Sequence, residues 1–207
     1  MASGYARATG RIGVVIVTCG PGATNCVTPV RDCIADSIPI VVITGQVPTS
    51  SIGTDAFQEA PVSGVMGSVA KHVFLVTDPD LRETSMRSAM EIAGSGRPGP
   101  VVVDGPKDVQ NWVGTYRGEG LLPVPGYRHR IQKTRENTMS EEHCEEFFAF
   151  LNNCERPLIY AGGGVINANA AEAVRTFALT YKIPVTTTLM GLGGFDTMHP
   201  LALHMLG

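Results

Sequence analysis

The stretch IGVVIVT at residues 12–18 runs directly into CGPGATN at residues 19–25, and this junction decides the fold. A short, continuous apolar run rich in β-branched residues is typical of a strand buried on both faces of a parallel sheet. Residues 39–44 (PIVVIT) and 100–104 (PVVVD) repeat the pattern. Between the first two runs, residues 22–37 carry apolar side chains at helical spacing. This alternation predicts an α/β fold with a parallel sheet.

Further signals extend the pattern through the first half of the chain. Residues 78–94 predict a second helix, because Asp78 can accept a hydrogen bond from the first turn. Residues 75–76 fit the end of a short strand. Pro29 lies inside the helix expected at residues 22–37, so we expect a bend or an irregular turn there.

The character of the sequence changes in the second half. Residues 111–138 are rich in glycine and proline and have no sustained period, which predicts a linker. Order resumes where Ser140 and His143 form a pattern similar to a capping box. The signals that follow are a strand at 157–161, a glycine turn at 162–164, a helix at 168–181 and a strand at 183–188. We predict a partial parallel-sheet βαβ domain at residues 1–110 and the beginning of a Rossmann-like α/β domain at residues 139–207.

Composition excludes several classes of protein. The 207 residues are 43% hydrophobic and 17% charged, which excludes a disordered chain, and the net charge of −3 gives no reason to expect a nucleic-acid partner. No apolar run reaches the ~20 residues of a membrane-spanning helix. Five cysteines without a C-x-x-C pair indicate buried, reduced thiols. The five histidines show no metal-ligand spacing with them, so no metal site is predicted.

Two glycine-containing turns follow predicted strands. The turn at residues 20–25 would let backbone N–H groups face a ligand, although an ordinary strand-to-helix turn has the same pattern. Gly162 and Gly164 loosely resemble a dinucleotide-binding turn. Asn167 replaces the third glycine of that fingerprint, and residues 183–188 contain no acid. NAD binding is therefore not favoured.

The long loop at residues 45–59 (GQVPTSSIGTDAFQE) follows a predicted strand, where ligand sites in parallel sheets usually lie. Phe57 offers either an apolar wall or a core contact, and Gln58 offers an uncharged donor and acceptor. Asp55 and Glu59 are interpreted as solvated surface acids rather than as paired carboxylates.

A second loop, SGRPGP at residues 95–100, holds Arg97 before the third predicted strand. An arginine in a rigid loop suits a phosphate or carboxylate ligand. A solvated arginine fits the same spacing equally well.

The motifs are more specific together than any one of them is alone. In chain order they are GYARATG, GPGATN, IPIVVITGQVPTSSIGTDAFQE, AKH, SGRPGPVVVD, PKD, YAGGGV and TLMGLGGF. This set spans nearly the whole chain and resembles the large, catalytic subunit of the acetolactate synthase (acetohydroxyacid synthase) family of thiamine-diphosphate enzymes. Three departures are Cys19, where serine is frequent, Gly67, where arginine is common, and Gly105, where valine or leucine is usual.

The resemblance implies an activity and a cofactor. The family decarboxylates pyruvate and joins the two-carbon fragment to a second 2-ketoacid in branched-chain amino-acid synthesis, with thiamine diphosphate as the electron sink. It implies that Pro21, Gly22 and Asn25 border the aminopyrimidine of the cofactor. Phe57 and Gln58 match residues near the reacting carbon, where Gln58 can hydrogen-bond an intermediate oxygen.

The same resemblance implies further partners. Lys107 of PKD, with Pro48 and Ala56, matches a substrate channel near a subunit interface. The family also binds FAD without a redox role. The positions that match its FAD contacts are Arg97, Gly162, Gly163, Thr188, Leu189 and Met190. A homodimer or tetramer is implied, and whether a regulatory subunit binds stays open.

Two features of the family are not found in these residues. The activating glutamate lies upstream of GYARATG, and the Gly-Asp-Gly motif that holds the diphosphate and Mg²⁺ lies in a C-terminal domain. We therefore expect a partial subunit without synthase activity of its own. The resemblance fits the cytoplasm of a bacterium, or a plastid or mitochondrion of a eukaryote.

Two alternatives remain open. Another thiamine-diphosphate carboligase or decarboxylase, such as glyoxylate carboligase, would share GPGATN and SGRPGPV, but glyoxylate carboligase lacks the activating acid. A non-catalytic nucleotide-binding module would bind FAD through the glycine turns without turnover.

Overall fold

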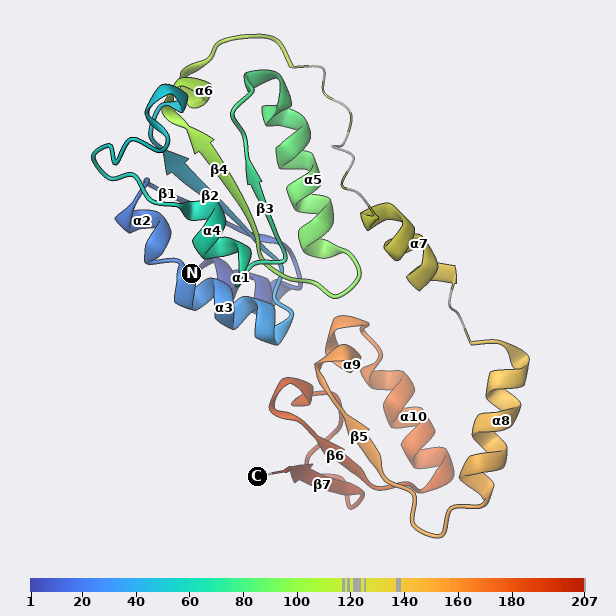
Figure 1. Ribbon diagram of the computed structural model, residues 1–207. Coiled ribbons are helices and arrows are strands. Elements are labelled where there is room, and N and C mark those ends of the chain that lie inside the picture. Colours follow the sequence, from blue (N-terminus) through green and yellow to red (C-terminus); the bar gives the residue numbers. More distant parts are fainter. Residues whose placement is uncertain (117, 119, 121–123, 125, 137–138, 207) are drawn as a thin grey trace. The chain divides into compact units, whose positions relative to one another are not determined.

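The structure, a computed structural model, describes residues 1–116, 118, 120, 124, 126–136 and 139–206. The chain divides into two compact units, Met1–Glu136 and Asn137–Gly207. Figure 1 shows that each unit has its own sheet and its own helices. Every strand pair in the described residues is parallel, which confirms the predicted α/β class.

The first unit is built on a four-stranded sheet in the order β1–β2–β4–β3. Its strands are β1 (Gly13–Val17), β2 (Ile40–Gln46), β3 (His72–Leu75) and β4 (Val101–Pro106). Its helices are α1 (Ala2–Thr9), α2 (Pro21–Thr24), α3 (Val27–Asp36), α4 (Val62–Gly67), α5 (Arg82–Gly94), α6 (Lys107–Asn111) and α7 (Tyr127–Glu136), with 3-10 turns η1 (Thr49–Ser51) and η2 (Pro79–Leu81). Because all four strands are parallel, their carboxyl ends meet at one edge of the sheet.

Strand β4, one of the two central strands, is buried on both faces. Val101 and Val103 pack in one core cluster with Ala89 and Ile92 of α5, which runs alongside β3 and β4 in Figure 1. Val102 points to the opposite face and is also fully buried. Burial on both faces explains why β2 and β4 have continuous apolar sequences rather than alternating ones. The edge strand β1 differs from the sequence expectation, because Val14 and Ile16 leave one of its faces exposed.

The helix expected at residues 22–37 is in fact two helices. α2 ends at Thr24, and α3 begins after Cys26. Pro29 lies in the first turn of α3, where the N–H that proline lacks has no helical partner in any case. The expected irregularity is present, but it lies upstream of Pro29.

Several other boundaries differ from the sequence expectations. The sequence predicts neither α6 nor α7, and α7 lies within the stretch expected to be a linker. Tyr127, the first residue of α7, is buried against the core of the first unit. Asp78 does cap a helix, but it caps η2, where its carboxylate accepts a hydrogen bond from the backbone N–H of Asp80 (2.9 Å).

The second unit contains a three-stranded parallel sheet in the order β5–β6–β7. Its elements are α8 (Glu141–Asn152), β5 (Ile159–Ala161), α9 (Gly163–Asn167), α10 (Ala171–Tyr181), β6 (Val185–Thr187), η3 (Leu189–Gly191) and β7 (Ala202–Met205). The capping box is confirmed, since the hydroxyl of Ser140 accepts from the backbone N–H of His143 and the His143 ring accepts in return. Ala161, Ala178 and Val185 form the centre of the core.

The end of α10 offers a test of backbone strain. Lys182 follows the helix with φ 53° and ψ 38°, the left-handed conformation that glycine adopts without cost. We expect Lys182→Gly to raise the free energy of unfolding by about 0.5–1 kcal/mol. Urea unfolding measures the change. Lys182→Ala is the control, because it removes the side chain and keeps the strain; an equal gain from alanine would contradict this explanation.

Candidate functional site

Most of the predicted site residues of the first unit follow the carboxyl ends of three neighbouring strands. Val17 pairs with Thr44, and Thr44 pairs with Asp104, so β1, β2 and β4 end at one edge of the sheet. The residues that follow these strands at this edge are Pro21, Gly22 and Asn25 after β1, Phe57 and Gln58 in the loop after β2, and Lys107 after β4. Ligands of parallel α/β sheets bind at such an edge.

The turn after β1 and the loop after β2 are in direct contact. Gly20 approaches Gln58 so closely that a Cβ on Gly20 would lie 2.4 Å from the Gln58 carbonyl oxygen. The thiol of Cys19 donates to the side-chain oxygen of Gln58 (3.6 Å). The Gln58 side chain therefore faces the GPGATN turn, and two motifs that lie 38 residues apart in sequence form one surface.

The loop after β2 is anchored by polar side chains whose roles the sequence does not reveal. The carboxylate of Asp108 accepts from the backbone N–H of Thr49 (3.0 Å) and from its hydroxyl. Where the ends of the loop come together, the amide of Gln46 donates to the carbonyl of Ala60 (3.1 Å) and accepts from the N–H of Val47 (2.9 Å). These bonds fix where the loop leaves the sheet and where it returns.

A buried carboxylate stabilises the end of β2, where this loop begins. Asp104 is 1% exposed, and its two carboxylate oxygens accept from the hydroxyl of Thr44 (2.7 Å) and from the amide of Gln46 (3.1 Å). Burial raises the pKa of Asp104, against the opposing effect of these two hydrogen bonds. The available sequence signal is that all three polar residues interrupt strands that are otherwise apolar.

The predicted site residues at this edge are open to solvent. Phe57 is 90% exposed, so it is not the core contact that the sequence left open. Pro21, Asn25 and Lys107 are also exposed. Within the described residues, the side chain of Asn25 has no hydrogen-bond partner, which leaves its amide available to a ligand.

The second unit brings its own predicted residues together. β5 and β6 are parallel neighbours, so the turn after β5 lies beside η3, which follows β6. A Cβ on Gly163 would lie 2.9 Å from the Cβ of Met190, and Gly162 lies beside the hydroxyl of Thr188. Thr188 caps η3 by accepting from the N–H of Gly191 (3.1 Å), and Leu189 is exposed.

Arg97 is placed differently from the other predicted residues of its unit. It precedes β4 and therefore lies at the amino-terminal edge of the sheet, opposite Phe57 and Gln58. Its guanidinium donates to the hydroxyl of Ser37 (2.8 Å) and to the carbonyl of Ala35 (2.8 Å) at the end of α3. These contacts stabilise the helix terminus, where carbonyls lack helical partners.

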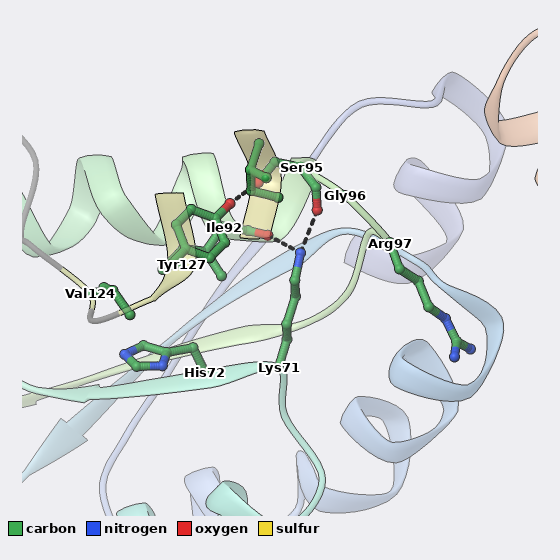
Figure 2. Close-up of a pocket in the computed structure, with 9 residues that line it drawn as sticks. Lys71, His72, Ile92, Ser95, Gly96, Arg97, Val124 and Tyr127 are labelled. Carbon is green, nitrogen blue, oxygen red and sulfur yellow. Dashed lines mark hydrogen bonds between the residues drawn. The ribbon is translucent and has the colours of Figure 1, made fainter. Parts of the chain in front are cut away.

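A cavity of about 300 Å³ lies at the same amino-terminal edge, and the sequence does not predict it. Figure 2 shows Lys71 reaching between Ile92 and Ser95, while Arg97 points away from them. The Lys71 ammonium donates to the carbonyls of Ser95 (2.6 Å) and Ile92, at the end of α5. The two cations that line this cavity, Lys71 and Arg97, are thus both engaged by helix termini.

Lys71 gives the first unit a specific pH dependence. Burial lowers the pKa of Lys71 from 10.5 to about 8. Between these values the folded state binds fewer protons than the unfolded state, so stability is expected to rise as the pH rises from 8 to 10.5. Lys71 is only half-buried, so the slope should stay below the ~1.4 kcal/mol per pH unit of a full proton.

This dependence is measured as the difference in urea-unfolding free energy between wild type and Lys71→Met across that pH range. The difference isolates Lys71, because the other groups titrate in both proteins. A difference that does not change with pH would contradict a lowered pKa at Lys71.

The cysteines and possible metal ligands add little to the site. All five cysteines are free, and only Cys33 is fully buried, so the expectation of buried thiols is wrong for the other four. Burial raises the pKa of Cys33 to about 11.

In the described residues, no group of three or more histidine, cysteine or acidic side chains could hold a metal ion. None of the helices in that part of the chain is long and apolar enough to cross a membrane.

Comparison with known families agrees with the geometry of both units. The N-terminal TPP binding domain of thiamine pyrophosphate enzymes matches residues 1–65, and the central domain of the same enzymes matches residues 144–207. The chain therefore belongs to the thiamine pyrophosphate enzymes. The first match includes β1, β2 and the loop that holds Gln58, and the second includes β5 and the turn that holds Gly162.

Within this class, the chain is similar to acetolactate synthases along its whole length, which confirms the resemblance seen in the motifs. It is 47% identical over 206 residues to acetolactate synthase 1, chloroplastic, of Zea mays. It is 46% identical to the acetolactate synthase large subunit of Corynebacterium glutamicum and 43% identical to the chloroplastic enzyme of Arabidopsis thaliana. These matches cover 100% of this chain and 30–32% of each relative, so the chain spans about a third of their length.

Proposed function

We propose that the protein acts in thiamine-diphosphate-dependent decarboxylation of pyruvate and transfer of the two-carbon fragment to a second 2-ketoacid, the acetolactate synthase reaction. The observation that carries this proposal is the 43–47% identity with acetolactate synthases over the whole chain. The contact between the GPGATN turn and Gln58 supports it, because two motifs of the resemblance form one surface.

The carboxyl edge of the first sheet fits the pyrimidine part of the cofactor. Pro21 and Gly22 present backbone and apolar surface, and the Asn25 amide is exposed without a partner in the described residues. Thiamine diphosphate, when bound, supplies the electron sink for decarboxylation. Pro21, Gly22 and Asn25 would orient its ring.

The remaining residues of this edge would handle the substrate. Phe57 offers an exposed apolar face that shields the reacting carbon from water. The Gln58 amide would hydrogen-bond a developing oxyanion. Lys107 begins α6 at the end of β4, where its ammonium attracts the carboxylate of an incoming 2-ketoacid.

FAD and Mg²⁺ are further parts of the proposal. Gly162, Gly163, Thr188, Leu189 and Met190 meet at the carboxyl edge of the second sheet, a location that suits a nucleotide, and FAD would bind there without a redox role. Arg97 would have to contact FAD beyond its bonds to α3. Mg²⁺ would accompany the cofactor diphosphate, for which the described residues offer no acidic cluster.

The exposed edge also favours assembly. Phe57 is a large, solvent-exposed apolar side chain. Its exposure favours a homodimer or tetramer with the cofactor between subunits. We propose the cytoplasm for a bacterial source and a plastid or mitochondrion for a eukaryotic one. A regulatory subunit would be a further partner of the assembled enzyme.

A complementation experiment tests the activity. The 207 residues alone are expected to be inactive, so the complete gene that encodes them is expressed in a host that lacks acetolactate synthase, and growth is scored without isoleucine, valine and leucine. We expect growth, and we expect acetolactate from pyruvate in the extract when thiamine diphosphate and Mg²⁺ are added. Condensation of glyoxylate with no acetolactate would favour glyoxylate carboligase, and FAD binding without turnover would favour a nucleotide-binding module.

A further inference from the structure

We propose that Glu59 is a positioning residue that sets the conformation of Phe57 and Gln58. This inference rests on the proposed function and deepens it, because Phe57 and Gln58 are the residues placed beside the reacting carbon. The sequence suggests a solvated surface acid at this position. The structure instead uses both carboxylate oxygens of Glu59 inside the loop.

The hydrogen bonds of Glu59 join residues 53–59 into a small closed loop, here called the Glu59 ring. One carboxylate oxygen accepts from the N–H of Gly53, and the other accepts from the N–H of Ala56 (3.1 Å). The N–H of Glu59 donates in return to the carbonyl of Ala56 (2.8 Å). Phe57 and Gln58 lie between Ala56 and Glu59, which these hydrogen bonds join. The hydrogen bond from Gly53 is the main cause of a lowered Glu59 pKa, so the carboxylate that makes these bonds stays ionised.

Gln58 needs such support because its backbone is strained. Its φ is 62°, in the left-handed region that residues other than glycine rarely adopt. Strained residues persist where neighbouring structure holds them, and they concentrate at functional sites. Gly20 contacts the Gln58 carbonyl on one side, and the Glu59 ring holds the adjacent backbone on the other. Together they turn the Gln58 side chain toward Cys19 and the GPGATN turn.

The chemistry of this support requires a carboxylate. Ionised glutamate offers two acceptor oxygens, whereas glutamine offers one oxygen and an NH₂ group that would face a second N–H donor. Glu59→Gln is therefore nearly isosteric but deletes one of the two loop bonds. We expect the ring to loosen and Gln58 to leave the left-handed conformation.

Hydrogen exchange tests the ring without reference to catalysis. In Glu59→Gln, the amide of Gly53 or of Ala56 should exchange about tenfold faster, as expected for the loss of one hydrogen bond, while the amides of α5 keep their rates. Asp78→Asn is the matched control, because it also alters a carboxylate that accepts a backbone N–H, outside this loop. Unchanged exchange at both loop amides would overturn the proposal.

Kinetics test whether Glu59 acts through Gln58. With the protein expressed from its own gene, Glu59→Gln should lower kcat about tenfold, with KM for pyruvate and half-saturation by thiamine diphosphate changed less than about twofold. The double variant Gln58→Ala/Glu59→Gln should be no slower than Gln58→Ala alone. Additive losses would overturn the positioning role. If the wild type makes no acetolactate, the proposed function fails, while the exchange experiment still decides the role of Glu59.

Discussion

Gly20→Ala is expected to lower the free energy of unfolding of the first unit by about 3 kcal/mol. Gly20 adopts φ 53° and ψ −109°, a conformation that residues with a Cβ avoid. The added Cβ would also lie 2.4 Å from the Gln58 carbonyl oxygen, a backbone atom that can move only with its loop. Strain and overlap therefore act together. Urea unfolding of the purified protein measures the loss.

Gly64→Ala provides the matched control for this substitution. Gly64 lies in α4, and a Cβ there would meet no heavy atom within 4 Å. Because alanine is favoured over glycine in a helix by roughly 0.5–1 kcal/mol, we expect Gly64→Ala to be neutral or stabilising. If Gly20→Ala were equally harmless, the close approach of the turn to Gln58 would be wrong.

The sequence predicts β1, β2 and β4 well because each is a continuous apolar run, although only β2 and β4 are buried on both faces. The runs at residues 12–18, 39–44 and 100–104 fall on β1, β2 and β4, with small shifts in their ends. The helix at residues 127–136 has no such signal. It is held through Tyr127, and a contact with a distant core does not produce local periodicity.

The candidate site could be predicted in part, because motif position and topology together place it. Residues after neighbouring parallel strands must meet at one edge, so the proximity of the GPGATN turn to the Gln58 loop follows once the strand order is known. The strand order itself, and the bonds of Arg97 to the end of α3, depend on tertiary contacts. The sequence does not predict the role proposed for Glu59 for the same reason. Its hydrogen-bond partners are backbone N–H groups, which every residue except proline supplies.

Asp104→Ala is expected to cost about 3 kcal/mol of unfolding free energy, because it leaves buried partners unsatisfied. The Thr44 hydroxyl would lose its acceptor, and the NH₂ group of Gln46 would keep only the Ala60 carbonyl as an acceptor. The raised pKa of Asp104 adds a signature in pH. The folded state holds this proton more tightly, so the stability from Asp104 should fall as the pH rises above the ordinary value of 3.8.

The matched control for Asp104→Ala removes donor and acceptor together. In Thr44→Val/Asp104→Val, no hydroxyl is left without a partner, and the β-branched side chains suit two central strands. We expect this double variant to lose less stability than Asp104→Ala, with the second N–H of Gln46 as its remaining cost. The pH-dependent part should vanish in both, because neither retains the carboxyl group. A double variant less stable than Asp104→Ala would contradict the view that the unsatisfied Thr44 hydroxyl causes much of the loss.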